Sequence, residues 1–218
     1  MIKAENIQVF NFDGAIRGLR NPYDSWDKSD SRWKISAEDE NELYYDIGEK
    51  DLSLMQNLYN GGSEHRKYMR QILICMDITA PLYWWKQFDT YKVGTTANSC
   101  STMHTIAKKE FTLDDFSFDD KNRKEEIPIE YFLPMLQQLN GLRDSYLETK
   151  DKTVWRLLIQ LLPEAYNQKR TVTMNYEVAA NIIHQRRNHK LQEWNTFIDI
   201  LLNHLPYLEE ITGEEPNE

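Results

Sequence analysis

The final third of the chain restricts the fold most, because one strand pattern runs directly into two helical patterns. Residues 170–174 are rich in β-branched side chains, which favour a strand. Residues 176–187 follow with a helical pattern. The next helix carries an apolar stripe at helical spacing, made of Leu191, Trp194, Ile198, Leu201 and Leu205. This order predicts a fold that mixes α and β structure.

Shorter patterns divide the rest of the chain. Strands are predicted at 6–12 and within 68–78, and helices at 51–59, 82–91, 129–149 and 154–162. Turns or loops are predicted at Asp13-Gly14 and over 20–34, 94–102 and 110–126, and an acidic stretch spans 38–51. The chain shows no internal repeat and no linker. We therefore expect one domain over residues 1–218, with a frayed acidic tail at 212–218.

Composition excludes several classes of protein. With 40% hydrophobic and 12% aromatic residues, the 218-residue chain can build one sizeable core. A mean hydropathy of −0.70 and the lack of an apolar run of ~20 residues exclude an integral membrane protein. A net charge of −9 argues against general binding to nucleic acid. Residues 1–6 lack signal-peptide architecture, and Cys75 and Cys100 cannot form a disulfide framework, so we expect a reduced, cytoplasmic protein.

A cationic segment stands out in this anionic chain. Residues 184–190 carry three formal positive charges and two histidines, a pattern that favours a bound anion. A phosphate suits it, because the planar fork of arginine donors matches phosphate oxygens. The alternative is a solvated helix end, where cations are favoured by the helix dipole. His184 and His189 are five residues apart and do not share a helix face, so no metal site is predicted.

Three further groups have both a binding and a structural interpretation. Residues 94–102 are dense in hydroxyls and can wrap a phosphate, or form an ordinary polar loop. Glu64-His65 can hold a ligand, or can form the N-terminal turn of a helix, where the helix dipole favours the negative charge of the glutamate. The aromatic residues on the predicted helix at 82–91 can stack on a ring, but packing in the core is the stronger expectation. These are Tyr83, Trp84, Trp85, Phe88 and Tyr91.

Residues 162–194 resemble the C-terminal part of the flavin-dependent thymidylate synthases. That family has a Leu-Pro, an Asn that starts a helix, a second Asn or His six residues on, an Arg five after that, and an Ala-Gln-Trp-Glu-like segment. The same order is found here in Leu162-Pro163, Asn175, Asn181, Arg186 and Gln192, with Leu191 in place of the Ala. The resemblance implies a central, mainly antiparallel sheet flanked by helices. It also implies that Asn175 and Asn181 lie near a flavin, and that Arg186 lies at the pyrimidine ring of dUMP.

A second segment is similar to the signature of the same family, an Arg-His-Arg followed by Ser-x-Asn-Glu-x-Ser-x-Arg-Tyr. Gln87, Asn98 and Ser101 are kept, while Thr96 and Lys92 replace a Ser and the last Arg of the triplet. The resemblance implies flavin contacts at Lys92 and His65. It implies substrate contacts at the following positions: Gln87, Asn98, Ser99, Ser101, Arg186 and Gln192.

The chain also departs from the family at positions that carry charge. Thr90 and Tyr91 stand for the Arg and His of the triplet, and Glu177 stands for an Arg near the start of the helix. The other departures are Ser99 for Glu, Met103 for Arg, His104 for Tyr and Ile159 for Arg. Cations that could compensate for the lost phosphate contacts are Lys86, Lys92, Lys169, Arg170 and Arg187.

Two functions follow from the resemblance. As an enzyme, the chain would methylate dUMP to dTMP with FAD, NADPH and methylenetetrahydrofolate, and would form a homotetramer with sites between subunits. Arg186 would be its candidate catalytic residue, stabilising negative charge on the pyrimidine. As a binding protein, the chain would keep the fold and hold a nucleotide or another phosphorylated ligand without catalysis. A third, weaker option is another pyrimidine nucleotide as substrate.

Overall fold

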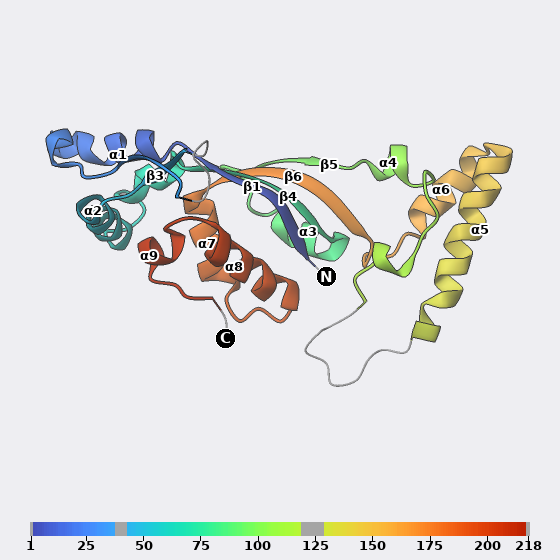
Figure 1. The fold of residues 1–218 in the computed structure, drawn as a ribbon. Coiled ribbons are helices and arrows are strands. Elements are labelled where there is room, and N and C mark those ends of the chain that lie inside the picture. Colours follow the sequence, from blue (N-terminus) through green and yellow to red (C-terminus); the bar gives the residue numbers. More distant parts are fainter. Residues whose placement is uncertain (1, 38–42, 119–128, 217–218) are drawn as a thin grey trace. The chain divides into compact units, whose positions relative to one another are not determined.

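The computed structural model describes residues 2–37, 43–118 and 129–216. Parts of the acidic stretch, of the loop at 110–126 and of the tail at 212–218 lie outside the described residues. The fold mixes helices with two antiparallel sheets, as expected. The larger sheet has the strand order β1-β4-β6-β5, and β2 pairs with β3 in the smaller one. Figure 1 shows β1, β4 and β6 running side by side.

The strands match the predicted ones where the sequence alternates or is strongly apolar. The larger sheet contains β1 (Lys3–Phe10), β4 (Leu73–Pro81), β5 (Thr96–Ser99) and β6 (Asn167–Asn175). The smaller sheet contains β2 (Arg32–Ile35) and β3 (Leu43–Asp46). In β4, alternate side chains point to opposite faces of the sheet, so that Ile74, Met76 and Ile78 are fully buried. The predicted strand within 68–78 is therefore confirmed in its second half.

The helices occupy most of the remaining chain. The α-helices are α1 (Phe12–Arg20), α2 (Glu49–Asn60), α3 (Leu82–Phe88), α4 (Thr102–Thr105), α5 (Leu133–Thr149), α6 (Lys152–Gln160), α7 (Tyr176–Arg186), α8 (Gln192–His204) and α9 (Leu208–Thr212). Short 3-10 helices are η1 (Asn21–Tyr23), η2 (Trp26–Lys28), η3 (Arg66–Arg70), η4 (Leu113–Asp115) and η5 (Ile129–Tyr131). Within the described residues, no helix is both long and apolar enough to cross a membrane.

Two local predictions were wrong. The turn at Asp13-Gly14 is instead the first turn of α1, whose apolar face buries Phe12, Ala15, Ile16 and Leu19. Gly14 packs closely there, because a Cβ on it would lie 2.2 Å from Oδ1 of Asn11 and would displace that side chain. The predicted loop at 94–102 contains strand β5, which is exposed along its whole length. An exposed edge strand has no buried face, so it leaves no alternating pattern in the sequence.

The chain divides into two compact units, each with its own core. Unit 1 comprises the described residues of Met1–Glu5, Asp77–Thr90 and Ala97–Thr171, and unit 2 comprises those of Asn6–Met76, Tyr91–Thr96 and Val172–Glu218. The single domain over residues 1–218 stays a prediction. In unit 1, Trp84, Trp85 and Phe88 are buried, which confirms their predicted packing role. A second cluster of unit 1 comprises Ile106, Phe111, Phe116, Leu139 and Leu158, and draws its last two members from the packed helices α5 and α6.

The core of unit 2 surrounds α7. Helix α7 packs on α8, α9 and η3, and Ile182 and Ile183 on it are fully buried. In Figure 1, α7 and α8 lie side by side with α9 next to them. The predicted stripe on α8 is confirmed: Trp194, Ile198 and Leu201 are fully buried. These helices hold the C-terminal end of α7, where the cationic segment begins.

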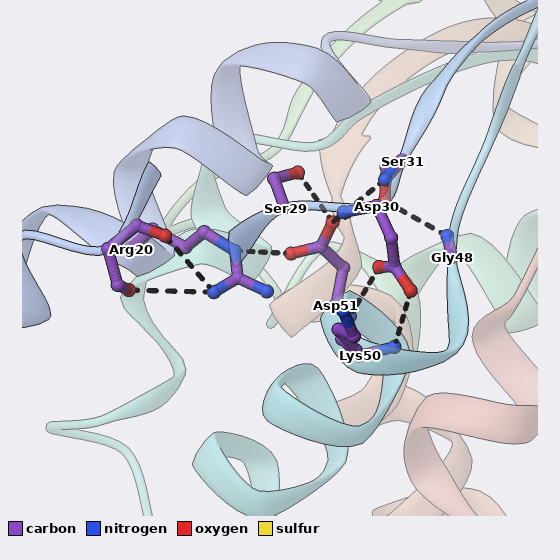
Figure 2. Close-up of polar contacts among 8 residues, drawn as sticks. Arg20, Ser29, Asp30, Ser31, Gly48, Lys50 and Asp51 are labelled. Atoms are coloured by element: carbon purple, nitrogen blue, oxygen red, sulfur yellow. Dashed lines mark hydrogen bonds and ion pairs between the residues drawn. The ribbon is translucent and has the colours of Figure 1, made fainter. Parts of the chain in front are cut away.

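A buried carboxylate joins the loop before β2 to the start of α2 (Figure 2). Asp51, on α2, is fully buried and accepts five hydrogen bonds. One comes from Nε of Arg20, a side chain that is itself buried (2.6 Å). The others come from the hydroxyls of Ser29 and Ser31 (each 2.6 Å) and the backbone N–H groups of Asp30 and Ser31 (each 3.1 Å).

The neighbouring Asp30 completes this connection. Its carboxylate accepts from the backbone N–H groups of Lys50 (3.0 Å) and Asp51 (3.2 Å), which are in the first turn of α2 and have no partner within the helix. The hydroxyl of Ser31 accepts from the N–H of Gly48 (3.0 Å). The loop, β2 and α2 of unit 2 are therefore fixed by one polar network.

Candidate functional site

The ten residues predicted to form a site fall in both units. Six are in unit 2: His65, Lys92, Asn175, Asn181, Arg186 and Gln192. Four are in unit 1: Gln87, Asn98, Ser99 and Ser101.

Arg186, the last residue of α7, lies against two aromatic rings of unit 2. Its Nε donates to the hydroxyl of Tyr91 (3.0 Å), and that hydroxyl donates to Oε1 of Gln185 (3.1 Å). The guanidinium carbon lies 4.7 Å from the ring centroid of Trp194 and 5.6 Å from that of Tyr91. Such cation–π contacts hold the side chain in one orientation. The half-buried Arg186 is therefore a cation placed in advance of any ligand.

His189 adds little charge to this region. Burial, followed by the positive charges of Arg186 and Lys190, lowers the pKa of His189 from its ordinary value. Its Nδ1 accepts from the N–H of Leu191 (3.0 Å), which also requires an unprotonated nitrogen. The formal positive charges of the segment are those of Arg186, Arg187 and Lys190.

Asn175 ends β6 and caps α7. Its Oδ1 accepts from the N–H of Val178 (3.0 Å), a donor that the helix itself leaves unpaired. Its Nδ2 faces Gly94, where a Cβ would come within 2.7 Å and where φ is +79°. The segment Tyr91–Thr96 thus lies against α7 at two places. Gly94 lies near the start of α7, and Tyr91 lies near the end of α7. The hydroxyl of Thr95 is buried with no hydrogen-bond partner among the described residues.

The other predicted residues of unit 2 are more open. Asn181, Lys92 and His65 are exposed. Gln192 is the first residue of α8, and its Oε1 accepts from Nδ2 of Asn195 (3.3 Å). Asn175, Asn181 and Arg186 are thus spread along one helix, as the order of the motif predicted.

In unit 1, three of the four predicted residues line the exposed segment around β5. Asn98 and Ser99 are exposed on the strand, and Ser101 precedes α4. The segment is fixed to β6, because the N–H of Cys100 donates to the carbonyl of Lys169 (2.9 Å). Gln87 lies half-buried on α3. The arrangement offers a row of hydroxyl and amide groups that can hydrogen-bond to a ligand.

Four of the five cations proposed as replacements already have a carboxylate partner. Lys86 pairs with Glu164, and Arg170 pairs with Asp89 (2.7 Å). Lys169 pairs with Asp77 (3.3 Å) and Glu5 (3.5 Å), and Arg187 pairs with Glu214 (2.8 Å). Lys92 forms no ion pair with any described residue. These pairings reduce the number of cations that can take the place of the family's arginines without rearrangement.

A basic element that we did not predict packs on α7. Arg66, Lys67 and Arg70 are in η3, directly after His65. Arg70 donates to Glu177 through two nitrogens, Nε (2.5 Å) and Nη2 (3.0 Å). The glutamate that stands where the family has an arginine therefore has an arginine beside it in space. The sequence signal for this element was the presence of three basic residues within five consecutive positions of a chain that is acidic overall.

A pocket of about 600 Å³ in unit 2 was also missed. It is lined mostly by aromatic and aliphatic side chains of β1, β2, β3 and the segment around α9, and none of the ten predicted residues lines it. Its aromatic members are Phe10, Phe12, Trp33, Tyr44, Tyr45 and Tyr207. Because these residues come from three strands, from α1 and from the start of α9, the sequence gives no local motif for the pocket.

Comparison with known proteins gives a whole-chain match in structure only. No protein-family model and no curated protein matches the sequence. A crystal structure of thymidylate synthase X (ThyX) from Helicobacter pylori with FAD and dUMP superposes with a TM-score of 0.70, at 16% identity over 98% of this chain and 97% of that one. The chain has the ThyX fold. A second structure of flavin-dependent ThyX from Helicobacter pylori, complexed with FAD and dUMP, gives a TM-score of 0.69 at 18% identity over 100% and 99% of the two chains.

The ThyX fold confirms the predicted fold class. Both superpositions extend over nearly the whole of each chain, so no large part of the ThyX fold is missing here. At such low identity the likeness is one of fold, and the roles of the ten residues stay predictions.

Proposed function

We propose that this chain binds dUMP and FAD and catalyses the reductive methylation of dUMP to dTMP, with NADPH and methylenetetrahydrofolate as further substrates. The observation that carries the proposal is a whole-chain ThyX fold in which Arg186 ends α7 with its guanidinium held by Tyr91 and Trp194. A fixed cation of this kind can stabilise negative charge that develops on a pyrimidine ring.

The residues of unit 2 fit a flavin in their chemistry. Asn175 at the start of α7 offers an amide nitrogen, and the segment Tyr91–Thr96 offers the exposed ammonium of Lys92 and the hydroxyl of Thr95, which has no hydrogen-bond partner among the described residues. These groups can hydrogen-bond to ring carbonyls or pair with a phosphate. FAD, when bound, would supply hydride transfer, while the protein orients the reactants. Asn98, Ser99, Ser101, Gln87 and Gln192 are proposed to contact dUMP.

Turnover tests the proposal directly. We expect the purified protein, supplied with FAD, NADPH, methylenetetrahydrofolate and dUMP, to form dTMP that liquid chromatography and mass spectrometry detect. Product should be lost when either FAD or methylenetetrahydrofolate is omitted, because each supplies a group that the chain lacks. Product that forms equally well without FAD would contradict the flavin mechanism.

The alternative is a binding protein without this activity. It is favoured by the ion pair between Arg70 and Glu177, and by the pairing of Lys86, Lys169, Arg170 and Arg187 with carboxylates. In that case dUMP or another phosphorylated ligand binds, but no dTMP forms in the complete mixture. Binding measured beside turnover separates the two functions.

We also propose that the protein is a homotetramer, as the resemblance implies. The exposure of Leu157 on α6 and of Leu161, which caps the C-terminal end of α6 four residues later, supports an interface in unit 1. Light scattering at micromolar concentration should give about four times the chain mass of 26.0 kDa. A clean monomer would contradict any site shared between subunits.

A further inference from the structure

The residues after α9 contact one arginine of the cationic segment. Gly213 has φ +68°, and the chain beyond it places the carboxylate of Glu214 2.8 Å from Nη2 of Arg187. The same nitrogen donates to the backbone carbonyl of Glu215 (2.9 Å). The Nε of Arg187 is buried and has no hydrogen-bond partner among the described residues. Arg187 thus uses one nitrogen twice while a buried donor stays unused.

Arg66 is a second cation with an unused buried donor. Its guanidinium carbon lies 4.7 Å from the ring centroid of Tyr59, and its Nε has no hydrogen-bond partner within the described part of the chain. The elements that carry these groups pack on one another: η3 packs on α2 and α7, and α9 packs on the same two helices. Arg66 and Tyr59 therefore lie on η3 and α2, while Arg187 and Glu214 lie just after α7 and α9, and α2 and α7 each pack on both η3 and α9.

The charge around Tyr59 supports this placement. The pKa of Tyr59 is raised, mainly by burial. The positive charge of Arg66 lowers this pKa, and the negative charge of Glu214 raises it. The phenol therefore lies within electrostatic range of both the guanidinium and the carboxylate.

The number of donors exceeds what one carboxylate can use. Each guanidinium carries five N–H donors, and a buried donor without a partner is costly. A carboxylate has two oxygens in one plane, whereas a phosphate has more oxygens arranged in three dimensions and carries more charge. A phosphate would therefore make better use of the two guanidinium groups than Glu214 does.

We propose that Arg66 and Arg187 form a binding site for a phosphate group, and that Glu214 occupies this site as an internal competitor. Gly213 allows the exchange, because glycine populates positive and negative φ with similar ease. An incoming phosphate displaces the Glu214 carboxylate and takes over its partners. The site is separate from the contacts of Arg186 and requires no catalysis, so it stands whether or not the chain makes dTMP.

Isothermal titration calorimetry with inorganic phosphate tests the site, in a phosphate-free buffer of low ionic strength. We expect the Glu214→Gln variant to bind phosphate about fivefold more tightly than wild type, which is the upper range for a partly exposed ion pair. The gain should shrink in 0.5 M salt, because the Debye length falls to about 4 Å and the charges are screened. Glu215→Gln is the matched control, because Glu215 contacts Arg187 only through its backbone carbonyl and should leave the affinity unchanged.

A second variant tests whether Arg187 binds the phosphate. Arg187→Gln in the Glu214→Gln background should remove the gain, and thermal melting checks that each variant is folded. The same titrations with dUMP identify the source of the phosphate: a gain with dUMP assigns the site to a nucleotide phosphate, and a gain with inorganic phosphate alone assigns it to the free ion. If Glu214→Gln increases the affinity for neither, or if the gain persists without Arg187, the proposal is overturned.

Discussion

We expect the Asp51→Ala variant to lose about 3–5 kcal/mol of unfolding free energy, because it leaves Arg20 as a buried charge without its partner. Arg20 and Asp51 are 5% and 0% exposed, so water cannot replace the lost carboxylate. The variant also removes the acceptor of both serine hydroxyls and of two backbone N–H groups (Figure 2). Urea denaturation followed by circular dichroism measures the loss.

Two further variants separate charge burial from general damage. Asp27→Asn changes an exposed carboxylate in the same region and should stay within about 0.5 kcal/mol of wild type. The double variant Arg20→Met with Asp51→Leu should be more stable than Asp51→Ala, because it removes both buried charges. A loss below about 1 kcal/mol for Asp51→Ala would show that the network does not stabilise unit 2.

The same carboxylate gives the stability a defined dependence on pH. Burial by itself raises the pKa of Asp51, but the hydrogen bonds from Ser29, Ser31 and Arg20 together bring it below its ordinary value. The stabilisation is therefore present above the unfolded pKa of about 3.9 and is lost as the pH falls through the folded pKa. The difference between wild type and Asp51→Asn should shrink below about pH 4.

Arg186→Ala should weaken dUMP binding by about 100-fold. This is the change in affinity expected when one of the stronger charge-assisted hydrogen bonds is lost. The fold should survive, with a loss of about 1–2 kcal/mol from one hydrogen bond and two cation–π contacts. Calorimetric titration with dUMP measures the affinity, and urea denaturation measures the stability. Wild-type affinity in Arg186→Ala would remove this residue from the site.

Graded replacements separate the charge of Arg186 from its orientation. Arg186→Lys keeps the charge but loses the planar fork, so its affinity should fall between those of wild type and Arg186→Ala. Tyr91→Phe keeps a ring beside the guanidinium and removes only the hydroxyl that accepts from Nε. It should reduce affinity less than Arg186→Ala does, since the cation remains.

Local patterns predicted the helices well and contacts distant in sequence poorly. Helix α7 begins and ends within one residue of its predicted bounds, because Asn175 caps it after a β-branched strand. Strand β5 gave no pattern because no face of it is buried. Helix α1 was missed because Gly14, which packs closely on Asn11, was interpreted as a turn residue.

The candidate site shows the same division. The motif order placed Asn175, Asn181 and Arg186 on one helix. It could not show that Tyr91, 95 positions before Arg186, accepts a hydrogen bond from it. Nor could it show that Arg70 lies beside Glu177, 107 positions away. Such pairs depend on how strands and helices meet, which no local spacing reports.

The most direct test of the account is to identify what the protein retains. The purified protein is incubated with FAD and dUMP, freed of excess ligand by gel filtration and denatured, and the released molecules are identified by mass spectrometry. We predict that both FAD and dUMP are recovered from wild type, and that dUMP is depleted from Arg186→Ala. Recovery of neither compound from folded wild-type protein would contradict the proposal that this ThyX fold holds a flavin and a pyrimidine nucleotide.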